Sequence, residues 1–264
     1  MEDRWIQPQV DVWVRAVEAL ARVAKRFPHA AWAAFCWSLQ AEWTYLCRVS
    51  ERVGPMLAPI EAAIRERFIP ALMGRERMEL EEDMRELMSL APKRGGLGIR
   101  NPCASAARMW EASEAASVEV VESFMGGTDL DLQAHAKCVK AARGAAQQER
   151  KEREEAFLLQ YAQRKGWKAA KRVKRLSEGG SAYLSRVPSR MEGTQLLLWE
   201  WHDAMSLRYE LTPVGLIHQC DGCGANFSVE HALSCKKGGL VVWRHNDAQL
   251  SRLGFAPKPF PPSR

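Results

Sequence analysis

The sequence lacks two features that direct proteins into membranes or out of the cell. No run of apolar residues approaches the length of a membrane-spanning helix. The start, Met-Glu-Asp-Arg-Trp, has neither the basic segment nor the apolar run of a secretory signal. These absences predict a soluble intracellular protein, in the nucleus or the cytoplasm, that is not secreted and has no membrane partner.

The signatures of common catalytic sites are also missing. No two aspartates are adjacent, so the usual carboxylate pair of two-metal polymerases is absent. There is no Gly-x-Ser-x-Gly elbow and no His-Glu-x-x-His helix. The cluster Gly95-Gly96-Leu97-Gly98 lacks the Gly-x4-Gly-Lys-Ser/Thr frame of a phosphate loop and does not follow a strand pattern. We therefore assign no catalytic residue and expect no enzymatic activity from this chain by itself.

The composition indicates a globular protein with a basic surface. A length of 264 residues with 47% hydrophobic content allows one large domain or two modest ones. The net charge of +6 and the pI near 9.0 favour a polyanionic partner. Seven cysteines, three of them beside a histidine, indicate metal binding rather than a disulfide framework in a reducing compartment.

Apolar residues at helical spacing predict a mainly α fold. Pro28 separates the first two predicted helices, and Lys93–Ile99 is predicted to form a tight turn with a short extended piece because three glycines disfavour a helix. Asp129 and Asp131 are expected to start the long polar helix that follows. The stripes that predict helices are Val10, Trp13, Val14, Val17 and Leu20; Trp32, Phe35, Cys36, Leu39, Trp43 and Leu46; Ile60, Ile64, Phe68 and Leu72; Leu80, Met84, Leu87 and Met88; Met109, Ser113, Val120, Val121 and Phe124; and Leu197, Trp201 and Met205.

Changes in composition divide the chain into four predicted parts. Residues 8–127 form a helical domain and residues 128–180 form a basic helical connector. Residues 181–250 contain one more helix and a cysteine-rich module, and the proline-rich tail 251–264 is expected to be disordered.

The cysteine-rich module has the spacing of a zinc site, Cys-x2-Cys-x7-His-x3-Cys. Thiolates and imidazole suit zinc, which prefers four tetrahedral ligands. Because four protein ligands leave no open position, the predicted site is structural. His218 and His245 flank the cluster as alternative ligands. The alternative interpretation is ordinary buried cysteines beside a chance histidine, but the specific spacing favours zinc. The predicted ligands of Zn²⁺ are Cys220, Cys223, His231 and Cys235.

A second candidate site is the basic segment at residues 164–175, which holds seven lysines and arginines and no acidic residue. Cations at this density can follow a phosphate backbone, and a tryptophan among them can stack on a base. A solvated helix face and a nuclear-localisation signal are the alternatives. The predicted nucleic-acid-binding residues are Arg164, Lys165, Trp167, Lys168, Lys171, Arg172, Lys174 and Arg175.

Two parts of the sequence resemble retroelement reverse transcriptases, in the region that follows the catalytic palm. The first part reads RFIPALMG at residues 67–74 and SLAPKRGGLGIRNPCASAARMWEAS at residues 89–113. The second reads WHDAMSLRYEL at residues 201–211 and CDGCGANFSVEHALSCKKGGLVVWRHND at residues 220–247, and it is similar to the cysteine–histidine module of non-LTR retrotransposon proteins.

The resemblance covers about residues 10–247 and implies a thumb-like helical bundle, a connection region and a CCHC zinc module. In the family the thumb and connection help to hold the template–primer duplex, and the fingers and palm precede them. We expect a truncated element or one exon of a longer gene, because the catalytic aspartates of the palm are absent. Arg244-His245-Asn246 matches the family phrase without an assigned role.

The leading functional expectation is therefore a non-catalytic, zinc-containing fragment that binds RNA, DNA or their hybrid. Two alternatives stay open. The chain could act in trans with a separately encoded polymerase palm, or it could be a zinc-stabilised scaffold for protein interactions.

Overall fold

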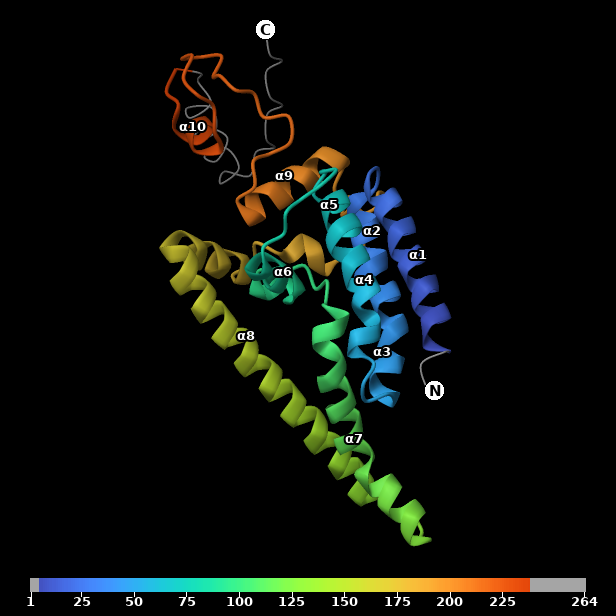
Figure 1. The fold of residues 1–264 in the computed structure, drawn as a ribbon. Coiled ribbons are helices and arrows are strands. Elements are labelled where there is room, and N and C mark those ends of the chain that lie inside the picture. Colours follow the sequence, from blue (N-terminus) through green and yellow to red (C-terminus); the bar gives the residue numbers. More distant parts are fainter. Residues whose placement is uncertain (1–4, 238–264) are drawn as a thin grey trace. The chain divides into compact units, whose positions relative to one another are not determined.

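A computed structural model describes residues 5–237 of the chain, and this part is mainly helical, as the sequence predicts (Figure 1). The chain divides into two compact units, Met1–Leu211 and Thr212–Arg264. The predicted boundaries after residues 127 and 180 both fall inside the first unit. The predicted tail, 251–264, lies outside the described residues.

The first unit begins with a bundle whose helices lie where the apolar stripes place them. Helix α1 packs against α2, α4 and α5, and α3 packs against the later helix α7. Aromatic rings fill the centre of the bundle: Phe35 stacks on Phe68 with ring centroids 4.7 Å apart, and Trp13 meets Trp43 edge-on at 6.1 Å. The elements are α1 (Ile6–Ala24), α2 (Pro28–Ala34), the π-turn η1 (Phe35–Leu39), α3 (Gln40–Val49), the 3-10 turn η2 (Gly54–Leu57), α4 (Ala58–Ala63), the π-turn η3 (Ile64–Phe68) and α5 (Ile69–Leu72).

The glycine-rich phrase forms a buried turn after helix α6 (Glu82–Ser89) and the 3-10 turn η4 (Pro92–Arg94). Gly95 and Gly98 adopt φ values of 91° and 72°, which disfavour any residue with a Cβ. Gly96 lies so close to the end of α6 that an added Cβ would come within 1.9 Å of the Leu90 carbonyl oxygen. The predicted tight turn is therefore confirmed, whereas among the described residues this segment forms no strand.

Side chains from three helices donate hydrogen bonds to the carbonyls of this turn. Trp32 Nε1 donates to the Leu97 carbonyl at 2.9 Å. Arg85 Nη1 donates to the Ile99 carbonyl at 2.8 Å, and Arg208 Nη2 donates to the Gly96 carbonyl at 2.7 Å. Because buried carbonyls are costly without a partner, these contacts hold the turn, which we call the central loop (residues 95–99), in one conformation.

Two long helices, α7 (Pro102–Gly126) and α8 (Leu132–Ser177), pack against one another as a hairpin (Figure 1). The side chain of Asn101 caps α7 by accepting a hydrogen bond from the Ala104 amide at 3.0 Å. Asp131 caps α8 in the same way, so its predicted role at a helix start is confirmed. Helix α8 is kinked at Gly166, where φ is 81° and ψ is −178°.

The first unit ends with the 3-10 turn η5 (Ala182–Ser185) and helix α9 (Leu198–Tyr209). Trp201 and Met205 are buried, as their spacing predicts. The predicted stripe is wrong at Leu197, which precedes the helix and is exposed. Trp201 Nε1 donates to the Leu72 carbonyl at 2.9 Å and thereby ties α9 to α5.

The membrane question has a simple structural answer for the described part of the chain. None of the helices within residues 5–237 is both long enough and apolar enough to span a membrane.

Candidate metal centre and basic surface

The first half of the metal-binding candidate is a tight turn in the second unit. Gln219 and Asn226 form an antiparallel bridge, and the Cys220 amide donates to the Ala225 carbonyl at 2.9 Å. The turn closes when the Gly224 amide donates to the Cys220 carbonyl at 2.8 Å, with Gly224 at φ 72°. This backbone places the two cysteines of the Cys-x2-Cys pair on the same side of the turn.

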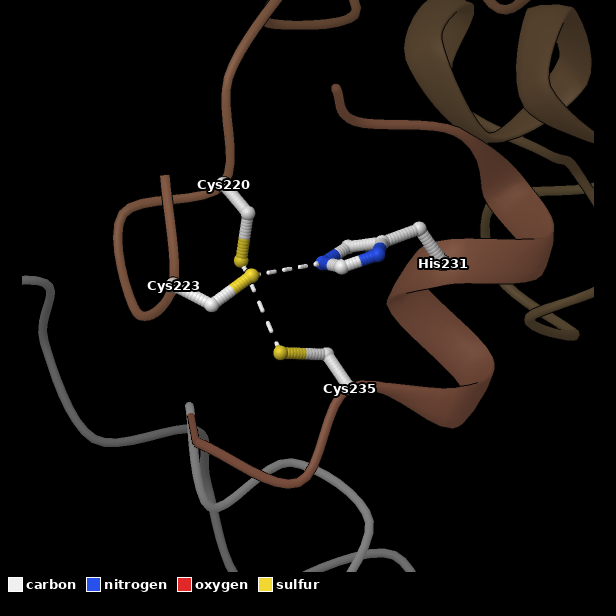
Figure 2. A group of neighbouring side chains, drawn as sticks. All are labelled: Cys220, Cys223, His231 and Cys235. Atoms are coloured by element: carbon white, nitrogen blue, oxygen red, sulfur yellow. Dashed lines mark hydrogen bonds between the residues drawn. The ribbon is translucent and has the colours of Figure 1, made fainter. Parts of the chain in front are cut away.

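The second half of the candidate comes from the short helix α10 (Val229–Ser234). Ser228 caps this helix, since its Oγ accepts a hydrogen bond from the His231 amide at 3.0 Å. The Cys235 amide donates to the His231 carbonyl at 2.8 Å, so one helical turn separates the two side chains and places them on one face. Figure 2 shows that both point toward the cysteines of the turn.

The four potential ligand atoms, the sulfurs of Cys220, Cys223 and Cys235 and a ring nitrogen of His231, all lie within 4.8 Å of one another. The Cys220 and Cys235 sulfurs are 3.7 Å apart, and the Cys223 sulfur is 3.2 Å from His231 Nε2 (Figure 2). In a tetrahedral site with metal–sulfur bonds of about 2.3 Å, neighbouring sulfurs are about 3.8 Å apart. The residues therefore fit one metal ion, and together they could hold it.

The second unit has little apolar core around this cluster. Within residues 212–237, the part of this unit that the structure describes, only Cys220 and Cys235 are buried. His218, an alternative ligand in the sequence, is exposed and is not part of the cluster. The other alternative, His245, and the phrase Arg244-His245-Asn246 lie outside the described residues. The cluster itself is therefore the main tertiary contact in this part of the chain.

Three cysteines outside the cluster pack in or against the core of the first unit. Burial raises the pKa of the Cys47 thiol to about 11 and also raises the pKa of Cys36 and of Cys103. These thiols stay protonated at neutral pH. Since metal binding and nucleophilic attack both need a thiolate, we assign these cysteines to packing.

The basic segment is divided by the kink at Gly166, and the two cations before the kink are ion-paired. Arg164 Nη2 lies 2.8 Å from an Asp83 oxygen, and Lys165 Nζ lies 2.5 Å from a Glu81 oxygen. These carboxylates belong to α6 or to the residue before it. The acidic start of α6 therefore partly neutralises the basic segment. The sequence signal that could have revealed this pairing is the acidic run at residues 81–83, which has the opposite charge to the basic segment at residues 164–175.

Arg172 differs from the other predicted nucleic-acid contacts, because it is only 6% exposed. Its guanidinium donates to the Tyr161 hydroxyl at 2.9 Å and forms an ion pair with Glu210 just after α9. Arg172 thus supports the packing of α8 against α9 and cannot present its charge to a phosphate. Its neighbours Ala169 and Val173 share the helix face that packs inward.

The remaining predicted contacts lie on the surface after the kink. Trp167 is 70% exposed, and Lys171 Nζ lies 5.9 Å from the centre of its ring. Lys168, Lys174 and Arg175 are also exposed, and Lys174 Nζ lies 3.8 Å from a carboxylate oxygen of Glu178. We call the exposed cations Lys168, Lys171, Lys174 and Arg175, with Trp167, the basic face of α8.

Comparison of the chain with models of protein families, with curated proteins and with solved structures finds no match. Two features of the molecule therefore bear on its function: the four-residue cluster of the second unit and the basic face of α8.

Proposed function

We propose that the chain is a zinc-containing nucleic-acid-binding protein that corresponds to the thumb and connection region of a non-LTR retrotransposon reverse transcriptase. Its role is to hold nucleic acid, with no catalytic step of its own. The observation that carries the proposal is the convergence of four metal-ligand side chains within the phrase that resembles the family module.

Zinc is the metal that best fits the cluster. Three thiolates and one imidazole form a soft, four-coordinate donor set, which is typical of structural zinc sites. Calcium and magnesium prefer oxygen ligands and higher coordination numbers. Because all four positions are filled by the chain, the ion stabilises the fold of the second unit and leaves no position for a substrate or an activated water.

The basic face of α8 supports the nucleic-acid part of the proposal. Its cations lie on a helix surface next to an exposed indole ring, a combination that suits phosphates and a base. Each cation that neutralises a phosphate releases a condensed counterion, so binding through this face depends steeply on salt.

The zinc assignment is tested by the metal content of the purified full-length chain. We expect one zinc per chain by elemental analysis and a clear loss of zinc in Cys223→Ser. Cys138→Ser is the matched control, because Cys138 lies outside the cluster and its thiol donates to the Ala115 carbonyl at 3.1 Å. A native chain without stoichiometric zinc, or equal zinc in both variants, would overturn the assignment.

The nucleic-acid assignment is tested by fluorescence anisotropy with a labelled RNA–DNA hybrid over a range of salt concentrations. Replacing Lys171, Lys174 and Arg175 by Gln should reduce the slope of log K against log salt by about 2.7, since each phosphate contact to a duplex contributes about 0.9. The matched control replaces Lys137, Lys140 and Lys151, exposed cations of the same helix. Identical slopes in the two triple variants would contradict this role of the basic face.

One observation favours a second candidate function, a protein partner. The tip of the α7–α8 hairpin exposes large apolar side chains, with Phe124 84% exposed and Met125 and Leu132 also on the surface. Such a patch is typical of protein interaction sites. It fits both a palm supplied in trans and a scaffold. Primer extension that appears only after a separate palm protein is added would favour the first of these.

A further inference from the structure

A large groove lies within the first unit, between α3, α7 and α8. Its volume is about 1310 Å³, which exceeds the roughly 300–1000 Å³ of typical small-molecule sites. Residues of the turn η1 and of the central loop also line it. We call this cavity the interhelical groove. It lies apart from the basic face of α8, whose residues do not line it.

The walls of the interhelical groove are predominantly basic. Seven cations face four carboxylates, and two of these carboxylates already have cationic neighbours: Glu154 accepts from Arg150 Nε at 2.8 Å, and Glu149 lies 3.8 Å from Arg153 Nη1. Glu154 also lies 3.7 Å from Arg94 Nε. The cations of the lining are Arg48, Lys93, Arg100, Arg108, Arg143, Arg150 and Arg153.

These arginines are close enough to repel one another. Burial lowers the pKa of Arg100, and the charges of Arg150 and Arg48 lower it further. Burial and the charge of Arg153 lower the pKa of Arg108, and the carboxylates of Glu149, Glu86 and Glu111 offset only part of this effect. Arg153 Nη1 is buried without a hydrogen-bond partner in the described part of the chain. A bound polyanion would relieve this repulsion by supplying the opposing charge.

An aromatic side chain is exposed at the wall of the same groove. Trp37 of η1 lines it and is 48% exposed. Its ring is held edge-on against Trp32 with centroids 5.6 Å apart, and Trp32 is itself fixed by its hydrogen bond to the Leu97 carbonyl. The indole of Trp37 is therefore a supported platform with one accessible surface, and such platforms stack on nucleic-acid bases.

We propose that the interhelical groove binds a single-stranded segment of nucleic acid, with its phosphates on the arginines and a base on Trp37. A single strand is favoured over a duplex because the bases of a duplex are covered by their own pairing and stacking, which leaves no ring free for Trp37. The inference rests on the proposed nucleic-acid function, and it adds a second binding surface and the class of strand that occupies it.

The role of Trp37 is tested with the full-length chain by anisotropy of a fluorescein-labelled oligothymidylate. Trp37→Ala should weaken binding by about five-fold to about 150-fold, the range that corresponds to the loss of one stacked base. Trp199→Ala is the matched control, since Trp199 is an exposed tryptophan of α9 that does not line the groove. Its affinity should equal that of the native chain.

The role of the arginines is tested with the double variant Arg100→Gln, Arg143→Gln. Both residues reach solvent, although the groove partly desolvates the Arg100 guanidinium, so the variant should fold, and helical circular dichroism verifies this. The salt slope for the same probe should fall by about 1.4, because each contact to a single strand contributes about 0.7. The control double variant Lys137→Gln, Lys140→Gln makes the same change in net charge on α8 outside the groove. Its salt slope should fall by less than that of the groove variant.

Several results would overturn the inference. One is native affinity in both groove variants, and another is displacement of the probe by an unlabelled duplex as effectively as by an unlabelled single strand. Equal displacement by polyglutamate would assign the groove to an acidic peptide instead. If the groove variants are unaffected while the triple variant of the basic face loses binding, only this inference fails. If the native chain binds no nucleic acid, this inference and the proposed function both fail.

Discussion

The buried ion pair between Glu61 of α4 and Arg85 of α6 gives a sharp test of how the central loop is held. Arg85 Nε and Nη2 each lie 2.7 Å from a Glu61 oxygen, and Nη1 donates to the Ile99 carbonyl. Removing one partner of a buried pair leaves an uncompensated charge and costs about 3–5 kcal/mol. We expect a loss of this size in the free energy of unfolding for both Arg85→Met and Glu61→Leu.

The double variant should lose less than either single variant. It contains neither charge, so the remaining cost is that of the Ile99 carbonyl left without its donor, about 1–3 kcal/mol. Urea unfolding followed by helical circular dichroism measures all four proteins of the cycle. The control Glu82→Gln removes an exposed ion pair with Arg65, also 2.7 Å long, and should cost at most about 1 kcal/mol. Additive losses in the double variant would refute the reasoning.

Three further perturbations have defined outcomes. Gly96→Ala should destabilise the chain by about 3 kcal/mol or more in urea unfolding, because its Cβ meets backbone oxygens, whereas Gly144→Ala, in open space within α8, should stabilise by about 0.5–1 kcal/mol. Burial lowers the pKa of His29 to about 4, so the neutral ring contributes stability above pH 6.5 that is lost as the pH falls toward 4; His29→Gln should flatten this dependence, and an unchanged pH profile would contradict it. Lys236 and Lys237 are exposed next to the cluster, so chelation of zinc should speed tryptic cleavage after them by loosening the backbone there, while the helical circular dichroism of the first unit persists. Equal cleavage rates with and without chelator would count against a structural ion.

The helices of the first unit could be predicted because burial on one face imposes the 3.6-residue period on the sequence. The contacts of the central loop could not be predicted from the sequence. Its carbonyls accept hydrogen bonds from Trp32 and Arg208, residues 65 and 112 positions away from their partners. Such pairings depend on tertiary packing, which leaves no local periodic signal. The glycines indicated a turn, but nothing in their spacing indicated its burial.

The candidate sites also differ in how far the sequence predicts them. The four-residue cluster could be predicted because its ligands lie within 16 residues of sequence and are positioned by a turn and one helical turn. The basic segment was predicted as one continuous surface, yet Arg172 is buried and Arg164 is paired with Asp83. The composition of a segment gives the number of its charged residues. The position of each residue around the helix axis determines which of these side chains reach solvent. The interhelical groove was missed because its arginines come from four separate segments of the chain.

The reach of Arg208 back to the central loop also sets the order in which the chain can fold. Closing a contact across 112 residues carries a large loop entropy and slows folding relative to local pairing. During synthesis at roughly 5–20 residues per second, Arg208 follows Gly96 by roughly 6 to 20 seconds. During that interval the Gly96 carbonyl lacks the donor that Arg208 supplies in the folded chain.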